Sequence, residues 1–210
     1  MLADGTYVLY YAVSAFGTQE SVIGVATSTT LDPGSWTDVG STGVESTTGD
    51  SYNAIDPNLI VVSGTNYLTF GSFWGDIYQT TLASDALTWS NTAPYEIELN
   101  TTSPQPSEGS YVFQYGSYYY LFFSSGTCCG YDTSMPAPGD EYKVMVCRSE
   151  SVTGGYVRLP PSLSVLPIIG WANTVSPGRR RWCRLPFQWR HARAWVPWDG
   201  VWSRRPGRVR

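Results

Sequence analysis

The chain has 210 residues, of which 14% are charged and 15% aromatic, enough for one domain with a substantial hydrophobic core. The many tyrosines and glycines are typical of short strands joined by tight turns, and no run of 18 apolar residues occurs, so a membrane-spanning helix is excluded. The formal net charge of −4 is unevenly distributed, because residues 1–150 carry −14 and residues 151–210 carry +10.

Three stretches of the acidic segment repeat one pattern: a Gly-polar turn, an alternating aromatic and aliphatic strand, and a small-residue exit. They are residues 4–17, 63–75 and 115–126. Their turn glycines, Gly5, Gly64 and Gly116, lie 59 and 52 residues apart. Further strands are predicted over residues 21–28, 76–84 and 141–149, and turn-plus-Trp units over residues 31–40 and 84–91.

A unit of about 50 residues with about four short strands has the spacing of a propeller blade. The sequence therefore predicts an all-β fold with about three propeller blades in residues 1–157. A β-sandwich is the alternative fold, but it would not require a repeated turn–strand motif at nearly constant intervals.

Two acids stand at equivalent places in the second and third repeats. Asp56 lies in the apolar run YNAIDPNLI and Glu108 in PSEGSYVFQYG, each eight residues before its turn glycine. Because the innermost strand of each propeller blade lines the central channel, equivalent positions on successive blades converge there. Two carboxyls brought together can polarise each other, one ionised and one protonated, as glycosidic cleavage requires. The alternative is that Asp56 caps a turn and Glu108 lies in a solvated loop.

The whole set of motifs resembles family 43 of the glycoside hydrolases, and within it the fungal enzymes that cleave arabinan internally. The resemblance covers about residues 2–157 and rests on YYAVSAFGTQESVIGVATS, YNAIDPNLI, YLTFGSFWGDIYQ, EGSYVFQYGSYYYLFFSSGTCCGYDTS and YKVMVCRSESVTGGYV. It implies a five-bladed β-propeller that hydrolyses α-1,5-arabinofuranosidic bonds with inversion, using three acids. By the AIDP and SEGSY motifs, Glu108 resembles the general acid and Asp56 the acid that orients and tunes it. The rival interpretations are an exo-acting xylosidase or arabinofuranosidase of the same family and a non-catalytic sugar-binding propeller.

Several other residues are candidates for contact with the sugar. Trp74, in GSFWGD, resembles a substrate-lining tryptophan that could stack on a furanose ring, although packing within a blade is the alternative. Asn53 could bind sugar hydroxyls or cap a turn, and Phe16 and Tyr131 are weaker candidates of the same kind.

The cysteines give no zinc-binding spacing, since no CxxC pair occurs. Cys128 and Cys129 are adjacent, and adjacent cysteines do not bond to each other easily without strain. The resemblance places TCCGYD on a loop near the substrate groove, with a bridge to Cys147 as one implied pairing. Cys183 lies in the basic segment.

Parts of the family pattern have no match. The general base is expected upstream of the segment where this chain starts, and Asp4, in DGTY, belongs to a hairpin turn and does not replace it. The pattern also stops after Val157, so we expect the first and last blades to be missing, together with the metal-associated histidine. His191 is not assigned that role. We expect no required cofactor, although the family often holds a structural metal ion.

Residues 158–210 form a tail with 11 arginines and six of the nine tryptophans. Such a tail could bind nucleic acid or an anionic surface, or fold back onto the acidic domain. The interpretation that we favour is a disordered tail or one that arises from a frameshift or an unspliced intron. As partners we expect arabinan of pectin side chains, with no nucleic acid and no membrane. The family implies secretion and a monomer, although no signal peptide is recognisable.

Overall fold

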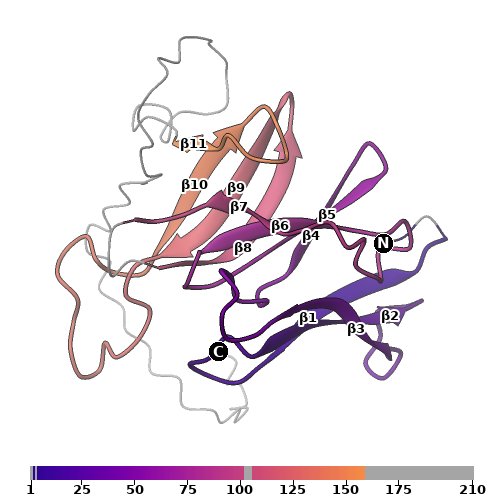
Figure 1. The fold of residues 1–210 in the computed structure, drawn as a ribbon, viewed down its shortest axis with the longest axis horizontal. Coiled ribbons are helices and arrows are strands. Elements are labelled where there is room, and N and C mark those ends of the chain that lie inside the picture. Colours follow the sequence, from indigo (N-terminus) through magenta and orange to yellow (C-terminus); the bar gives the residue numbers. More distant parts are fainter. Residues whose placement is uncertain (1, 3, 102–105, 159–210) are drawn as a thin grey trace, which may run out of the picture.

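The computed structural model describes residue 2 and residues 4–101 and 106–158 (Figure 1). All regular elements in this part of the chain are β-strands, as the composition predicts. No helix suited to crossing a membrane occurs among these residues. The predicted tail lies outside the described residues, except for Arg158.

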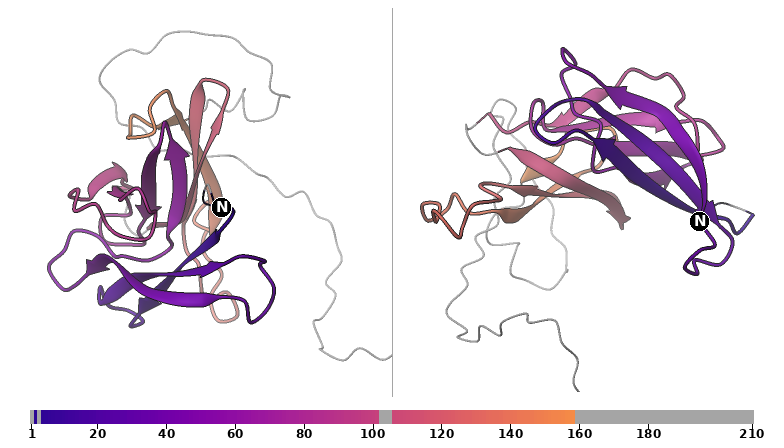
Figure 2. Two further views of the ribbon diagram at one scale, coloured as in Figure 1. Left: turned by 90° about the vertical axis from the view of Figure 1, so that its right-hand side faces the viewer. Right: turned by 90° about the horizontal axis from the view of Figure 1, so that it is seen from below.

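The strands form three antiparallel sheets, in each of which consecutive strands are neighbours. The first sheet contains β1 (Tyr7–Ser14), β2 (Ser21–Ser28) and β3 (Thr37–Ser46). The second contains β4 (Asn58–Val62), β5 (Thr65–Phe70), β6 (Ile77–Leu82) and β7 (Tyr95–Glu98). The third contains β8 (Ser107–Tyr115), β9 (Tyr118–Ser125), β10 (Lys143–Ser149) and β11 (Val157–Arg158). The second sheet lies between the other two (Figures 1 and 2), so the sheets follow one another as propeller blades.

The predicted repeat is confirmed by the turns between strands. Gly64 joins β4 to β5 with φ +81°, and Gly116 joins β8 to β9 with φ +60°, a backbone region that glycine enters without a steric penalty. Gly5 precedes β1, so β1 corresponds to β5 and β9. The described part of the first sheet therefore has no counterpart of β4 or β8, the strands that carry or follow the two predicted acids.

The hydrophobic core lies where neighbouring sheets meet. One cluster joins the first two sheets and contains Ile23, Val44, Ala54, Leu68, Phe70, Tyr78 and Leu82. A second cluster belongs to the third sheet and its Val152 turn, and Ile60, Val62, Tyr67 and Ile97 of the second sheet pack against it. Alternate residues of β9 are buried, which is the pattern expected of a strand with one face in the core. This packing fixes β4 and β8 side by side at the junction of the second and third sheets.

Candidate active site

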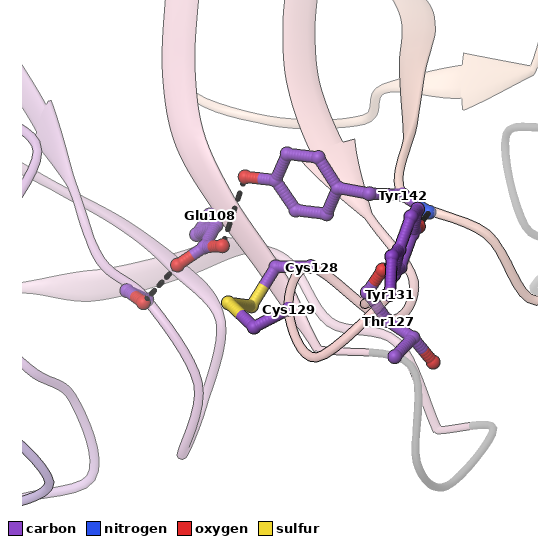
Figure 3. Close-up of a disulfide and its surroundings, with 7 residues drawn as sticks. Glu108, Thr127, Cys128, Cys129, Tyr131 and Tyr142 are labelled. Carbon is purple, nitrogen blue, oxygen red and sulfur yellow. Dashed lines mark hydrogen bonds between the residues drawn. A yellow bond between two sulfur atoms is a disulfide. The ribbon is translucent and has the colours of Figure 1, made fainter. Parts of the chain in front are cut away.

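Glu108 is the second residue of β8, and each of its carboxyl oxygens accepts one hydrogen bond. The Ser72 hydroxyl donates to Oε2 at 2.7 Å, and the Tyr142 hydroxyl donates to Oε1 at 2.8 Å (Figure 3). A backbone bridge between Ser72 and Glu108 and a bond from Phe73 N to Ser107 O join the β5–β6 connection to the start of β8. Both oxygens are thus held by side chains from different sheets.

Asp56 lies immediately before β4 in the left-handed backbone region, with φ 55°, which aspartate enters more readily than most residues. Pro57 follows it outside the strand, so its missing N–H removes no ladder bond. The Asp56 Oδ2 accepts a hydrogen bond from Gly109 N at 3.1 Å, one residue after Glu108. Asp56 is therefore bound to the very segment that carries Glu108.

The structure brings the two predicted acids together at the junction of two blades. Burial raises the pKa of Asp56, and the charge of Glu108 raises it further, while the Gly109 N–H acts in the opposite direction. The negative charge of Glu108 therefore favours the protonated form of Asp56. Such a pair can hold one carboxyl protonated and ready to donate.

Two further acids, Asp76 and Glu98, lie beneath this site and were not identified from the sequence. Asp76 is 3% exposed, and its carboxyl accepts hydrogen bonds from Asn100 N at 2.6 Å and Ser107 N at 2.9 Å. Burial raises the pKa of Asp76 to about 6 against these two bonds. Because Ser107 directly precedes Glu108, Asp76 anchors the start of the strand that carries the candidate acid.

Glu98 makes the stability of the fold depend on pH. Burial, and then the charge of Asp76, raise the pKa of Glu98 from 4.5 to about 8. The folded state therefore binds more protons than the unfolded state in this window, and the free energy of unfolding is expected to fall as pH rises from about 4.5 to 8. The expected loss is on the order of a few kcal/mol. Urea unfolding of the 210-residue chain between pH 5 and 8.5 measures it.

Glu98→Gln is expected to flatten the part of this dependence above pH 6 and to stabilise the chain at pH 8. Glu45→Gln, on an exposed position of β3, serves as the control and should leave the pH dependence unchanged. An equal slope in the parent chain and in Glu98→Gln would show that Glu98 ionises as readily in the folded state as in the unfolded state.

The residues predicted to contact sugar differ in their exposure and in their distance along the chain from the two acids. Trp74 is 47% exposed in the tight β5–β6 connection, two residues after Ser72, whose hydroxyl donates to Glu108. That connection requires Gly71, because a Cβ there would lie 2.0 Å from the carbonyl oxygen of Asp76. Phe16 is fully exposed in the β1–β2 turn, and its role as a sugar contact stays a prediction.

Asn53 does not fit its predicted contact with sugar. Its side chain is 3% exposed, and its Oδ1 accepts hydrogen bonds from the hydroxyls of Ser21 at 2.6 Å and Ser46 at 3.4 Å. The residue thereby joins the first sheet to the segment that leads to Asp56. The buried amide of Asn53 therefore stabilises the fold and is not available to bind sugar hydroxyls.

The expected cysteine pairing is wrong. Cys128 and Cys129 are bonded to each other, so neither forms the implied bridge to Cys147, which is disulfide-bonded as well. Figure 3 draws the adjacent pair together with Glu108 and Tyr142. Tyr131 is 37% exposed, but its hydroxyl is occupied within the same loop, donating to Thr127 O at 2.6 Å and accepting from Tyr142 N at 2.7 Å.

Neither a base nor a metal centre is assigned in this part of the chain. Asp4 accepts a hydrogen bond from Thr6 N at 2.9 Å in the turn before β1, which agrees with its interpretation as a turn residue. Within residues 4–101 and 106–158, no cluster of three or more His, Cys, Asp or Glu side chains is suited to hold a metal ion. His191 lies outside the described residues.

Two carboxyls brought together where two propeller blades meet form an arrangement that suits a glycoside hydrolase. The profile of glycosyl hydrolases family 43 matches residues 2–165. The chain belongs to this family.

Relatives and solved structures agree with the assignment. Over 154 residues the chain is 62% identical to arabinan endo-1,5-alpha-L-arabinosidase A of Aspergillus aculeatus, covering 73% of this chain and 48% of the relative. It therefore spans about half the length of the curated relatives that it matches. An exo-1,5-alpha-L-arabinanase from a bovine ruminal metagenomic library is similar in structure, with a TM-score of 0.64 and 35% identity over 75% of this chain and 52% of that one. Cellvibrio cellulosa alpha-L-arabinanase complexed with arabinohexaose gives 0.64 and 34%, over 75% and 53%.

Proposed function

We propose that residues 2–158 form the part of an arabinan-cleaving hydrolase that supplies its proton donor, Glu108. The observation that carries this proposal is the joining of Glu108 and Asp56 across two blades, with one donor on each oxygen of Glu108. The exposed Trp74 supports it, because an exposed indole two residues after Ser72 offers a flat surface for a sugar ring.

In the proposed reaction, Glu108 donates its proton to the oxygen of the leaving arabinosyl unit as the glycosidic bond breaks. A negative charge on Asp56, next to it, disfavours premature loss of that proton. A water molecule attacks the anomeric carbon from the opposite face, which gives inversion. The base that activates this water is assigned to no described residue.

Our first choice is cleavage at internal bonds of the arabinan polymer, because the A. aculeatus relative is named as an endo-acting enzyme. Exo-action is the second candidate, because the metagenomic exo-arabinanase has a similar structure. We also propose that the enzyme acts as a monomer outside the cell on pectin side chains. The Cys128–Cys129 disulfide supports secretion, since disulfides persist mainly in oxidising compartments.

The test is a hybrid protein in which residues 2–157 of this chain replace the matching segment of the A. aculeatus relative. The hybrid is expected to release a ladder of oligosaccharides from debranched arabinan, as resolved by chromatography. Release of one short product from the first time point would favour exo-action. A soluble, folded hybrid that binds arabinan without cleaving it would replace the proposal with a sugar-binding function.

Asp56→Asn tests the second acid in the same hybrid. Removing the negative charge makes ionisation of Glu108 easier, so the alkaline limb of the pH–rate profile is expected to move to lower pH by about one unit. The rate on arabinan should also fall. An unchanged alkaline limb would show that Asp56 does not tune the donor. Asp32→Asn, at an exposed position between β2 and β3, is a control that should leave both quantities unchanged.

A further inference from the structure

The loop between β9 and β10, residues 126–142, is closed upon itself at its base. Thr127 N donates to Asp140 O at 2.8 Å, and Thr127 and Glu141 form a parallel bridge. The two ends of the loop approach so closely that a Cβ on Gly126, which has φ +115°, would lie 2.3 Å from Glu141 O. The loop is therefore a compact unit on the third sheet.

Two hydrogen bonds of the Tyr131 hydroxyl connect the start of this loop, next to the Cys128–Cys129 disulfide, to its end. The Tyr131 hydroxyl donates to Thr127 O, next to Cys128, and accepts the backbone N–H of Tyr142. The disulfide joins two consecutive residues of the same turn, which restricts the backbone between Thr127 and Tyr131. The position of Tyr142 thus depends on the fold of the segment that contains the disulfide.

The hydroxyl of Tyr142 points at the carboxyl of Glu108 (Figure 3). Burial raises the pKa of this phenol to about 12, and the hydrogen bond to Glu108 and the charges of Glu108 and Asp56 add to the effect, against the Ser124 side chain. The phenol therefore keeps its proton and remains a donor over the whole pH range in which a glycosidase works. With Ser72 on the other oxygen, it fixes the rotation of the Glu108 carboxyl.

We propose that Tyr142 is a positioning residue for Glu108 and that the Cys128–Cys129 disulfide, through Tyr131, holds it in place. The inference rests on the proposed role of Glu108 as proton donor. It assigns a function to the adjacent cysteines, which otherwise lie exposed on the loop. It also accounts for the occupied hydroxyl of Tyr131, which supports the loop and is not free to bind sugar.

Tyr142→Phe in the hybrid tests the positioning role. Loss of a hydrogen bond to the negative charge that develops on Glu108 as it donates its proton is expected to lower kcat on debranched arabinan about ten- to hundredfold. The Michaelis constant should change by less than about threefold, because substrate binding is left intact. On a dinitrophenyl arabino-oligosaccharide, whose leaving group needs no proton, the loss should be much smaller. The alkaline limb should move to higher pH, because a donor to the carboxylate is lost.

Tyr115→Phe is the matched control, since Tyr115 is 52% exposed on the same sheet, and it should change none of these quantities. Equal losses on both substrates with an unchanged alkaline limb would overturn the positioning role of Tyr142.

The double replacement Cys128→Ser with Cys129→Ser, which leaves Cys147 in place, tests whether the disulfide holds Tyr142 in position. It is expected to reproduce the leaving-group dependence of Tyr142→Phe and to add nothing further in the Tyr142→Phe background. Additive losses would show that the disulfide acts through another route and would overturn this half of the proposal.

The contact is also measured without catalysis, in the 210-residue chain with 3-fluorotyrosine at position 142. Glu108→Gln is expected to shift the fluorine resonance, and the exposed Glu150→Gln is not. Identical spectra for the parent chain and Glu108→Gln would overturn the contact. If Glu108→Gln shifts the fluorine resonance of residue 142 but the unmutated hybrid does not cleave arabinan, the contact stands and only the proposed function is contradicted.

Discussion

Replacing Glu108 by Gln in the hybrid is expected to lower kcat on debranched arabinan by about a hundredfold to ten-thousandfold, because the amide cannot donate a proton to the leaving oxygen. The fold should survive, since Gln keeps the shape of the side chain and can still accept one of the two hydrogen bonds from Ser72 and Tyr142. Steady-state kinetics and a thermal unfolding curve on the same preparation separate these two effects.

The dinitrophenyl substrate is the control for this prediction. Its leaving group departs without a proton, so Glu108→Gln should slow its cleavage far less than that of arabinan. Glu150→Gln, on an exposed position after β10, should slow neither substrate. If Glu108→Gln depressed both reactions equally, Glu108 would not be the general acid.

The 210-residue chain alone is expected to release no product from debranched arabinan. Inversion requires a base on the face opposite Glu108, and Asp4 lies in a turn with its carboxyl bonded to Thr6 N. The outer sheets also expose apolar side chains: Leu9 is 47%, Val13 63% and Val144 57% exposed. The chain should therefore bind a hydrophobic dye, and dye fluorescence with a reducing-sugar assay measures both properties.

A matched experiment compares the chain with the hybrid at equal concentration. The hybrid should cleave arabinan and bind less dye, because additional blades cover the exposed faces. Clear turnover by the 210-residue chain would show that a base exists within it.

Much of the fold could be predicted because short runs of aromatic and aliphatic residues are bounded by glycine turns. SVIGVATS was expected as a strand and is β2, and the strands predicted to follow the turns at Gly64 and Gly116 are β5 and β9. β7 was not predicted, because YEIE is short and shows little contrast between its faces. β3 was predicted in part as a turn, since its first residues, TDVGST, are small, polar and mostly exposed.

The acid pair could also be predicted, because a repeat places equivalent residues at equivalent points of successive blades. Its surroundings could not. Ser72 reaches Glu108 across 36 positions of the sequence and Tyr142 across 34, and no local pattern marks either residue as a partner. Asp76 is hidden for the same reason, since its two acceptor contacts are to backbone N–H groups, which any residue carries.

The cysteines show where a general rule was misleading. A bond between adjacent cysteines was not expected because of its strain, and the resemblance implied a bridge to Cys147. The closed loop between β9 and β10 places the two residues in one turn, and the bond forms there. Asn53 is a similar case, because its partner Ser21 belongs to another sheet and removes the side chain from the surface.

The most direct test of the central claim, that Glu108 and Asp56 act as donor and neighbour in an inverting hydrolysis of arabinan, is the configuration of the first product. Proton NMR should follow the hybrid as it cleaves debranched arabinan, before the new reducing ends mutarotate. Our account predicts that β-configured reducing ends appear first, because water replaces the leaving group from the opposite face of an α-linked sugar. Reducing ends that appear first in the α configuration would contradict it, because retention requires one carboxyl of the site to act as a nucleophile.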